Sequence, residues 1–354
     1  MNMRKLTTML LLLVIAVTAS AQNAQIAHIR KMYAQVKEQV AQNGKDGMAP
    51  LDMTISTHEV TKVDDDFFID FDDQLTFYFT KYRIDSSLDY PDASSCYFIV
   101  GNSSANGHSS YREILFDPNE GYLLFSYMRA ETHAGMVIES RYYYDADGKL
   151  IEQKHKVGGD DATPDAQSWS DAEGDKKMAM KYLDIFNCML NTGQYHGADH
   201  LKASQGAPDA EQMKYIRSQY AEAKAKITRN SQAEENQSMQ IVIRDQTWGP
   251  PQITEVNYYY TGDGCYFIAD RRHHNNMGSD TSSEYLLAPK SSDLLFSYTC
   301  SKEEGEKYEW RYYFNKKGQC IEVKSNIDDQ DYGLGDKVAA YRYMQVYKAL
   351  RDSQ

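Results

Sequence analysis

The residues best suited to chemistry in this chain are acids, arginines and tyrosines that occur in two matching sets. The stretch RYYYDADGKLIE at 141–152 has a near copy, RYYFNKKGQCIE, at 311–322. Alternate side chains of a β-strand point to the same face of a sheet, so each copy gathers one set on one face. The sets are Glu139, Arg141, Tyr143 and Glu152 in the first copy, and Glu309, Arg311, Tyr313 and Glu322 in the second.

Two kinds of chemistry fit these sets. Arginine paired with glutamate on neighbouring strands is a structural ladder on a solvated sheet face, worth roughly 0.2–1 kcal/mol per pair. The same side chains also suit a ligand, because tyrosine rings stack and arginine donates paired hydrogen bonds to a glycan or a peptide. We favour the structural ladder and keep the two sets as a candidate binding surface.

The other face of the same strands is predicted to be core. It carries Tyr142 and Tyr144 in the first copy, with Tyr312 and Phe314 at the same places in the second. Aromatic side chains at every second residue are typical of a strand with one buried face. The charged face is expected to keep its contact with solvent.

Paired carboxylates also suggest glycoside hydrolysis, because that reaction uses two acids brought together only in the fold. Three acids recur in both copies: Glu113 and Glu284, Glu139 and Glu309, Glu152 and Glu322. Their recurrence suits structural pairing equally well. The sequence has no nucleophile elbow, phosphate-binding loop, dinucleotide fingerprint or Cys-x-x-Cys motif. We therefore favour a protein that is not an enzyme, with no catalytic residue assigned and no cofactor.

Two patterns that resemble metal sites are incomplete. His196 and His200 have the spacing of helical zinc ligands, but glycines at 193 and 197 interrupt a helix there. The DADG stretch at 145–148 begins like a calcium loop, yet Lys156 stands where the loop needs a bidentate glutamate. We predict a hairpin turn at DADG and no metal site.

Histidines occur in two polar segments that correspond between the copies. His108 lies in GNSSANGHSSY, and His273 and His274 lie in DRRHHNNMGSDTSS. Long polar hairpin tips can carry recognition. We add His273 and His274 to the candidate binding surface.

Further matches in the same order extend the repeat over most of the chain. The stretch 26–43 resembles 213–230, the stretch 111–127 resembles 282–298, and SCYFI resembles GCYFI at 264–268. A duplicated unit predicts such collinear matches. The expected organisation is a signal peptide at 1–21, a first repeat unit at 22–192, a linker at 193–209 and a second repeat unit at 210–354.

Each unit is expected to begin and end with an amphipathic helix, because apolar residues recur there at helical spacing. Between the helices lie β-branched and aromatic runs broken by turn residues. In the first unit these runs predict strands at 51–61, 67–82, 95–101, 111–117, 122–130, 136–145 and 149–156. The predicted fold class is α+β: two tandem copies of one unit, each with an N-terminal helix, an antiparallel β-meander of about six or seven strands and a C-terminal helix.

The first residues indicate export. Arg4 and Lys5 precede an apolar run from 9 to 17, and Ala-Ser-Ala follows at 19–21 as a cleavage site. The sequence offers no later apolar segment of membrane-spanning length, and no cysteine at the cleavage site for a lipid anchor. We expect an exported protein, periplasmic or extracellular, without a membrane span or anchor.

Charge and cysteine content narrow the class of partner. The formal net charge is −13 and basic residues are not clustered, which argues against nucleic acid and anionic membranes as partners. Three of the five cysteines, Cys188, Cys300 and Cys320, align with residues other than cysteine in the other copy. We favour buried thiols over disulfides.

These observations lead to three functional hypotheses. The first is an exported, non-catalytic binding or interaction protein whose duplicated sheet faces hold a glycan or a peptide. The alternative is an exported hydrolase that acts on glycans with a pair of carboxylates. The third is an inhibitor of another exported protein, with an envelope protein as its partner.

Overall fold

The structure is a computed structural model of the full chain. It describes 3–41, 51–62, 68–82, 93–105, 108–163, 171–190, 201–202, 204–229, 237–245, 252–274, 279–303, 305–327 and 332–351. His196 and His200 lie outside these residues. Among the helices in these ranges, none combines the length and the apolar character that a bilayer crossing requires.

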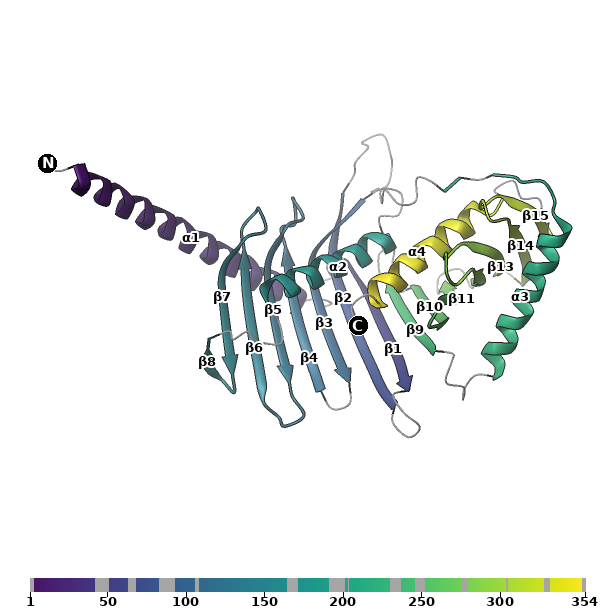
Figure 1. Ribbon diagram of the computed structural model, residues 1–354, viewed down its shortest axis with the longest axis horizontal. Helices are drawn as coiled ribbons and strands as arrows, with labels where there is room; N and C mark the ends of the chain where they lie inside the picture. The colour runs from purple at the N-terminus through teal and green to yellow at the C-terminus, as the bar shows by residue number, and fades with distance from the viewer. Residues whose placement is uncertain are drawn as a thin grey trace.

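The described strands form one antiparallel sheet of fifteen strands (Figure 1). The first half consists of β1 (Leu51–Lys62), β2 (Phe68–Tyr82), β3 (Ala93–Ala105), β4 (His108–Phe116), β5 (Leu123–Glu131), β6 (Val137–Tyr144), β7 (Leu150–Val157) and β8 (Asp160–Ala162). The second half consists of β9 (Gln237–Asp245), β10 (Gln252–Thr261), β11 (Gly264–His274), β12 (Ser279–Leu287), β13 (Leu294–Glu303), β14 (Glu306–Phe314) and β15 (Cys320–Ser325). Each half is a meander in which consecutive strands pair.

The two meanders join through their first strands. β1 pairs with β9 antiparallel, from Met53 opposite Asp245 to Glu59 opposite Met239. A separate sheet for each unit would leave these first strands as open edges with unpaired backbone groups. Their pairing satisfies both edges, so the α+β prediction is confirmed while the two sheets expected from the repeat are one.

The predicted strands of the first half are confirmed as strands β1 to β7. β3 and β4 extend further into the polar hairpin than the sequence indicated, because their serines pair across the strands. Ser103 lies opposite Ser110, and the two hydroxyls are 2.6 Å apart. The short edge strand β8 was not predicted.

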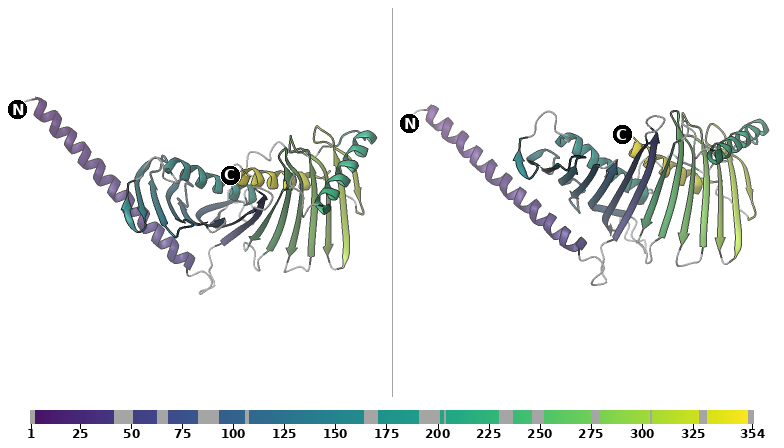
Figure 2. Two further views of the ribbon diagram at one scale, coloured as in Figure 1. Left: turned by 60° about the horizontal axis from the view of Figure 1, so that its bottom comes forward. Right: turned by 90° about the horizontal axis from the view of Figure 1, so that it is seen from below.

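Four helices in the described residues cover the two faces of the sheet (Figure 2). α2 (Ala172–Leu190) and α4 (Leu334–Arg351) lie on one face, the α2/α4 face, and pack against each other. α1 (Met3–Ala41) packs on β5 and β7, and α3 (Ala210–Arg229) packs on β12 and β13. Both lie on the opposite, α1/α3 face, so the molecule has three layers.

The α2/α4 face carries the larger core. Tyr142 and Tyr144 are buried there, as are Tyr312 and Phe314 in the second half. The sequence prediction of the core face is therefore confirmed. Residues of both halves and both helices share this core, since Ile55 of β1 and Ile241 of β9 belong to it.

The α1/α3 face is also buried beneath its helices, which differs from the solvated face expected from the sequence. Ile29 of α1 packs with Phe98 and Phe125, and Ile216 of α3 packs with Phe267 in the same manner. The helices account for the difference, because an amphipathic helix buries its apolar stripe on whatever sheet face lies next to it.

All five cysteines are buried, and no disulfide joins any two of them in the described part of the chain. Cys300 on β13 and Cys320 on β15 are separated by β14. The segment before α3 covers the outer edge of β15. The N–H of Cys320 donates to the carbonyl of Ser204 at 2.8 Å, and the N–H of Gly206 donates to the carbonyl of Cys320 at 2.8 Å.

Candidate binding groove and the charged sheet face

The structure places the predicted charged sets beneath or beside α1 and α3. The first set lies on β6 and β7, and the second lies on β14 and β15. Each set of four is brought together within its own half. The two sets stand near opposite edges of the sheet, so they do not form one common site.

In the first half, these residues bind each other and α1. The Tyr127 hydroxyl donates to Glu139 at 2.8 Å, and the Arg141 guanidinium lies 4.9 Å from the centre of the Tyr127 ring. Arg30 of α1 forms an ion pair with Glu152 at 2.7 Å.

The same Arg30 guanidinium lies 5.2 Å from the centre of the Tyr143 ring, and its Nε donates to the Tyr143 hydroxyl at 3.3 Å. Tyr143 is only 5% exposed. This ring therefore packs under the helix and is closed to a ligand in this conformation.

The second half repeats these contacts. The Tyr298 hydroxyl donates to Glu309 at 2.5 Å, and Arg311 lies 4.9 Å from the Tyr298 ring centre. Hydrogen bonds from Lys307 and Tyr298 lower the pKa of Glu309 below its usual value. These are the contacts that the structural-ladder interpretation requires.

α3 takes the place of α1 in this half. Arg217 pairs with Glu322 at 3.2 Å and lies 5.4 Å from the ring centre of Tyr313, which is 6% exposed. The contacts that join the helix to the sheet in the first half are thus repeated by matching residues in the second half.

The predicted histidines lie on β11, away from both charged sets. His273 Nδ1 lies 3.0 Å from Asp280 Oδ1 on β12. His274 pairs with Ser279 in the strand register.

The DADG stretch is a hairpin turn, as predicted: Asp145 Oδ1 accepts hydrogen bonds from the N–H of Asp147 at 3.0 Å and of Lys149 at 2.8 Å.

A groove of ≈ 950 Å³ opens on the α1/α3 face near the middle of the sheet. It lies over β9, β1, β2, β3, β4 and β5, beside the C-terminal part of α1. Its walls are mainly neutral hydroxyl and amide side chains, among them Ser56, Gln74, Asn102, Ser104, Ser109 and Gln240. The groove exists because α1 packs towards one edge of the sheet and α3 towards the other.

Aromatic and basic side chains line the end of the groove next to α1. The rings of Tyr111 and Tyr127 meet edge to face with centres 6.3 Å apart. Lys37 and Arg129 lie at the same end. Arg129 pairs with Glu131 at 3.3 Å and both are partly exposed, so the pair is weak and its guanidinium stays accessible to a ligand.

A buried carboxylate positions this end of the groove. Glu113 is 1% exposed and accepts hydrogen bonds from the hydroxyls of Tyr33 and Tyr111. It also forms an ion pair with Lys37 at 2.7 Å. Burial raises the pKa of Tyr33 and of Tyr111, and the hydrogen bonds to Glu113 raise it further, so both stay phenols that donate.

The second half keeps most of this cluster and lacks its groove-lining ring. Glu284 accepts a hydrogen bond from Tyr220 and pairs with Lys224 at 2.9 Å. Ser282 stands where the first half has Tyr111. The cluster itself is therefore structural, and the ring at the groove is specific to the first half.

The acids that line the groove are Asp72 and Asp73. They are consecutive residues of β2, so their side chains point to opposite faces of the sheet. Asp73 lies opposite Thr57, which is buried, and Asp72 opposite His58. The groove therefore has no pair of carboxylates facing each other from these two residues.

Sequence analysis identified the polar hairpin between β3 and β4 but not the groove. The sequence does place polar side chains on one side of β2, β3 and β4 where these strands pair: Asp72 and Gln74, Asn102 and Ser104, and Ser109. The groove itself depends on where α1 and α3 pack, which the pattern of the strands does not determine.

No group of three or more histidine, cysteine or acidic side chains that could hold a metal ion occurs among the residues with described placement. No protein-family model matches the sequence, and no curated protein matches it.

Proposed function

We propose that this chain is an exported, non-catalytic binding protein, and that the central groove on the α1/α3 face holds a segment of neutral glycan. The observation that carries this proposal is the groove of ≈ 950 Å³, whose walls combine neutral hydroxyl and amide groups with two tyrosine rings. Its size falls in the range of ordinary ligand sites.

The side chains suit sugars for a stated reason. Hydroxyls and amides donate and accept at once, which matches the hydroxyl groups of a sugar. Tyrosine offers an apolar ring that stacks on a sugar face and a hydroxyl that forms hydrogen bonds. A peptide is the second candidate, because the same amide groups could pair with a peptide backbone.

The hydrolase alternative receives less support. Glu113 is bound to two phenols and an ammonium, Glu139 to Tyr127, and Glu152 to Arg30. A general acid needs a raised pKa and a free path to the substrate. These three carboxylates are instead engaged by cationic and hydroxyl partners within the protein.

We also infer that the chain consists of two tandem copies of one unit. The support is the agreement of contacts between the halves. Arg30 and Arg217 bind Glu152 and Glu322, while Tyr127 and Tyr298 bind Glu139 and Glu309. Contacts that survive duplication are those the fold needs, whereas Tyr111 belongs to one copy alone. The basic and apolar residues of 1–21 support export.

The test is the binding of soluble neutral polysaccharides of different backbones, measured by isothermal titration calorimetry on the mature chain. We expect saturable binding by at least one polysaccharide, and Tyr111→Ala to weaken it roughly tenfold through loss of ring stacking. Tyr215→Ala is the matched control, because Tyr215 on α3 is 51% exposed and does not line the groove.

Three results would redirect the proposal. Binding that Tyr111→Ala leaves unchanged would remove the groove as the site. Binding of peptides but of none of the glycans would identify the second candidate. Release of reducing ends by the wild type, lost in Glu139→Gln, would establish the hydrolase.

A further inference from the structure

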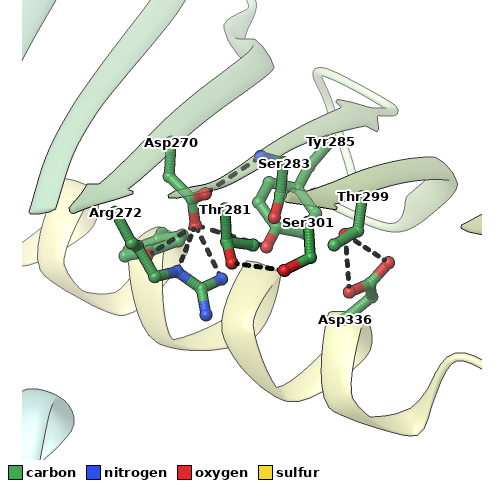
Figure 3. Close-up of polar contacts among 9 residues, drawn as sticks. Asp270, Arg272, Thr281, Ser283, Tyr285, Thr299, Ser301 and Asp336 are labelled. Atoms are coloured by element: carbon green, nitrogen blue, oxygen red, sulfur yellow. Dashed lines mark hydrogen bonds and ion pairs between the residues drawn. The ribbon is translucent and has the colours of Figure 1, made fainter. Parts of the chain in front are cut away.

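A buried carboxylate organises the space between the sheet and α4 in the second half (Figure 3). Asp270 on β11 is 3% exposed, and its Oδ2 accepts hydrogen bonds from the Tyr343 hydroxyl at 2.8 Å and from Arg272 at 3.0 Å. Its Oδ1 accepts a hydrogen bond from the N–H of Ser283 at 3.1 Å. A phenol, a guanidinium and an amide thus hold this carboxylate.

The first half has no carboxylate at the corresponding place. Extending the match between SCYFI and GCYFI by two residues puts Gly101 where the second half has Asp270. The strand register agrees, since Gly101 lies opposite Arg112 on β4, as Asp270 lies opposite Ser283 on β12. Both pairs sit at equivalent positions of the two meanders.

The phenol that would bind this carboxylate is nevertheless retained. The helix match places Tyr182 of α2 where α4 has Tyr343. No hydrogen bond joins the Tyr182 hydroxyl to any residue in the described ranges. Burial raises the pKa of Tyr182, so the hydroxyl keeps its proton and is available to donate.

A cavity of ≈ 220 Å³ occupies the space that results. Gly101, Ser103, Arg112 and Tyr182 line its polar end. Thr57, Asp73, Asn102 and Ser110 also line it, and the apolar part of the wall comes from both helices and both halves of the sheet: Ile55, Leu75, Met178, Met239 and Leu350. The cavity lies on the α2/α4 face, and it shares Thr57, Asp73, Asn102, Ser103 and Ser110 with the lining of the groove.

We propose that this cavity binds a small carboxylate with an apolar body, whose carboxyl group takes the place that Asp270 fills in the second half. The carboxyl group accepts a hydrogen bond from Tyr182 and lies against Arg112. The apolar body occupies the part of the cavity lined by Met178, Met239 and Leu350.

The charged groups at the cavity are Arg112 and Asp73, which line it, and Asp175, which pairs with Arg112. Arg112 is 2.7 Å from Asp175 through one nitrogen, and a guanidinium carries five N–H donors, so donors remain for a second carboxylate. The second half shows that the fold accepts two acids here. Asp336, the counterpart of Asp175, is buried, and that burial and the charge of Asp270 raise its pKa.

The size of the cavity limits the ligand. A cavity of about 150 Å³ is large enough for benzene, so ≈ 220 Å³ leaves room for a ring and a carboxyl group. Because Arg112 is shared with Asp175, we expect affinity in the micromolar to millimolar range. Benzoate is the probe that matches these dimensions, and benzamide is its uncharged counterpart.

The experiment titrates benzoate and benzamide into the mature chain and follows ligand-observed NMR and calorimetry. We expect saturable binding of benzoate and at least tenfold weaker binding of benzamide, because only the carboxylate gains the charged hydrogen bonds. Tyr182→Phe should weaken benzoate binding about tenfold. Tyr343→Phe, the same change in the second half, should not affect it.

A second variant supplies the missing carboxylate from the chain itself. Gly101→Asp combined with Leu75→Val should abolish benzoate binding, because the new side chain occupies the ligand's place. Leu75→Val is included because a Cβ on Gly101 would come within 3.2 Å of Leu75 Cδ2. Leu75→Val alone is the control and should keep benzoate binding. Circular dichroism checks that all variants fold.

Absence of saturable benzoate binding at millimolar concentration would overturn the proposal. Equal binding of benzoate and benzamide, or unchanged binding by the Gly101→Asp variant, would overturn it as well. Tyr111 lines the groove and not the cavity, and Tyr182 lines the cavity and not the groove, so the variants at these two residues test the two sites separately.

Discussion

Individual residues show how far alternation predicts burial. Tyr142 and Tyr144 were assigned to the core from their spacing, and both are buried. Tyr143 between them was assigned to a solvated face and is also buried, under α1. Period-two spacing separates the faces of a strand. It does not say which face a helix will cover, because that depends on packing between distant segments.

His155 on β7 is a residue whose protonation should affect stability. Its Nδ1 lies 3.0 Å from the Ser140 hydroxyl, and burial lowers its pKa. Its Nε2 is buried and has no hydrogen-bond partner among the residues that the structure describes. The folded protein therefore takes up a proton less readily than the unfolded chain. The contribution of neutral His155 to the free energy of unfolding is fully present above the pKa of the unfolded chain, about 6.5. It is lost as pH falls through the lowered pKa of the folded protein.

The measurement compares the wild type with His155→Asn, which keeps a polar atom near Ser140 but does not titrate. We expect the wild type to lose more of its free energy of unfolding than the variant when urea titrations move from about pH 7 to about pH 5. Parallel curves for the two proteins would show that His155 does not contribute to acid sensitivity.

At the scale of elements, strands and turns were largely predictable and their partners were not. The turn at 145–149 followed from Asp147 and Gly148, and Gly148 adopts a φ of 74°, where glycine is favoured. The sequence of α1 shows an apolar stripe but does not indicate that this stripe packs on β5 and β7. The same stripe would suit any apolar sheet face.

The attachment of α1 gives an element-scale prediction. Tyr33 and Lys37 of α1 both bind Glu113, which is 1% exposed. Glu113→Gln removes the charge that these donors share, and we expect a loss of about 1–3 kcal/mol in the free energy of unfolding. Faster hydrogen exchange in α1 should accompany it.

Glu284→Gln is the matched control for that variant. Glu284 binds Tyr220 and Lys224 of α3, but its side chain is 22% exposed and it lacks a second tyrosine partner. Water compensates part of the loss, so the effect should be smaller than for Glu113→Gln. Equal losses in urea unfolding would mean that burial of Glu113 does not strengthen the cluster.

At the scale of the whole molecule, the union of the two meanders was the feature that the sequence did not predict. The alternation of apolar and polar residues in β1 is that of any strand with one buried face, and it does not indicate which strand pairs with β1. Pairing with β9 follows from the need to satisfy two open edges. The shared core then forms because α2 and α4 pack across the junction.

This shared core predicts that the halves unfold together. Ile55 and Ile241 lie on the two strands that form the junction, and they belong to one apolar cluster with Phe186 of α2 and Tyr347 of α4. Opening one half would expose the junction surface of the other. Hydrogen exchange in urea, read by mass spectrometry, should therefore give β4–β6 and β12–β14 the same free energy of opening and the same dependence on urea.

Ile241→Ala tests the origin of that coupling. Ile241 is fully buried, and its truncation should lower protection in both halves by about 2–5 kcal/mol. Tyr215→Ala, a change at an exposed position, should leave both unchanged. If Ile241→Ala lowered the protection of β12–β14 while β4–β6 kept theirs, the halves would be independent folding units that merely share an edge.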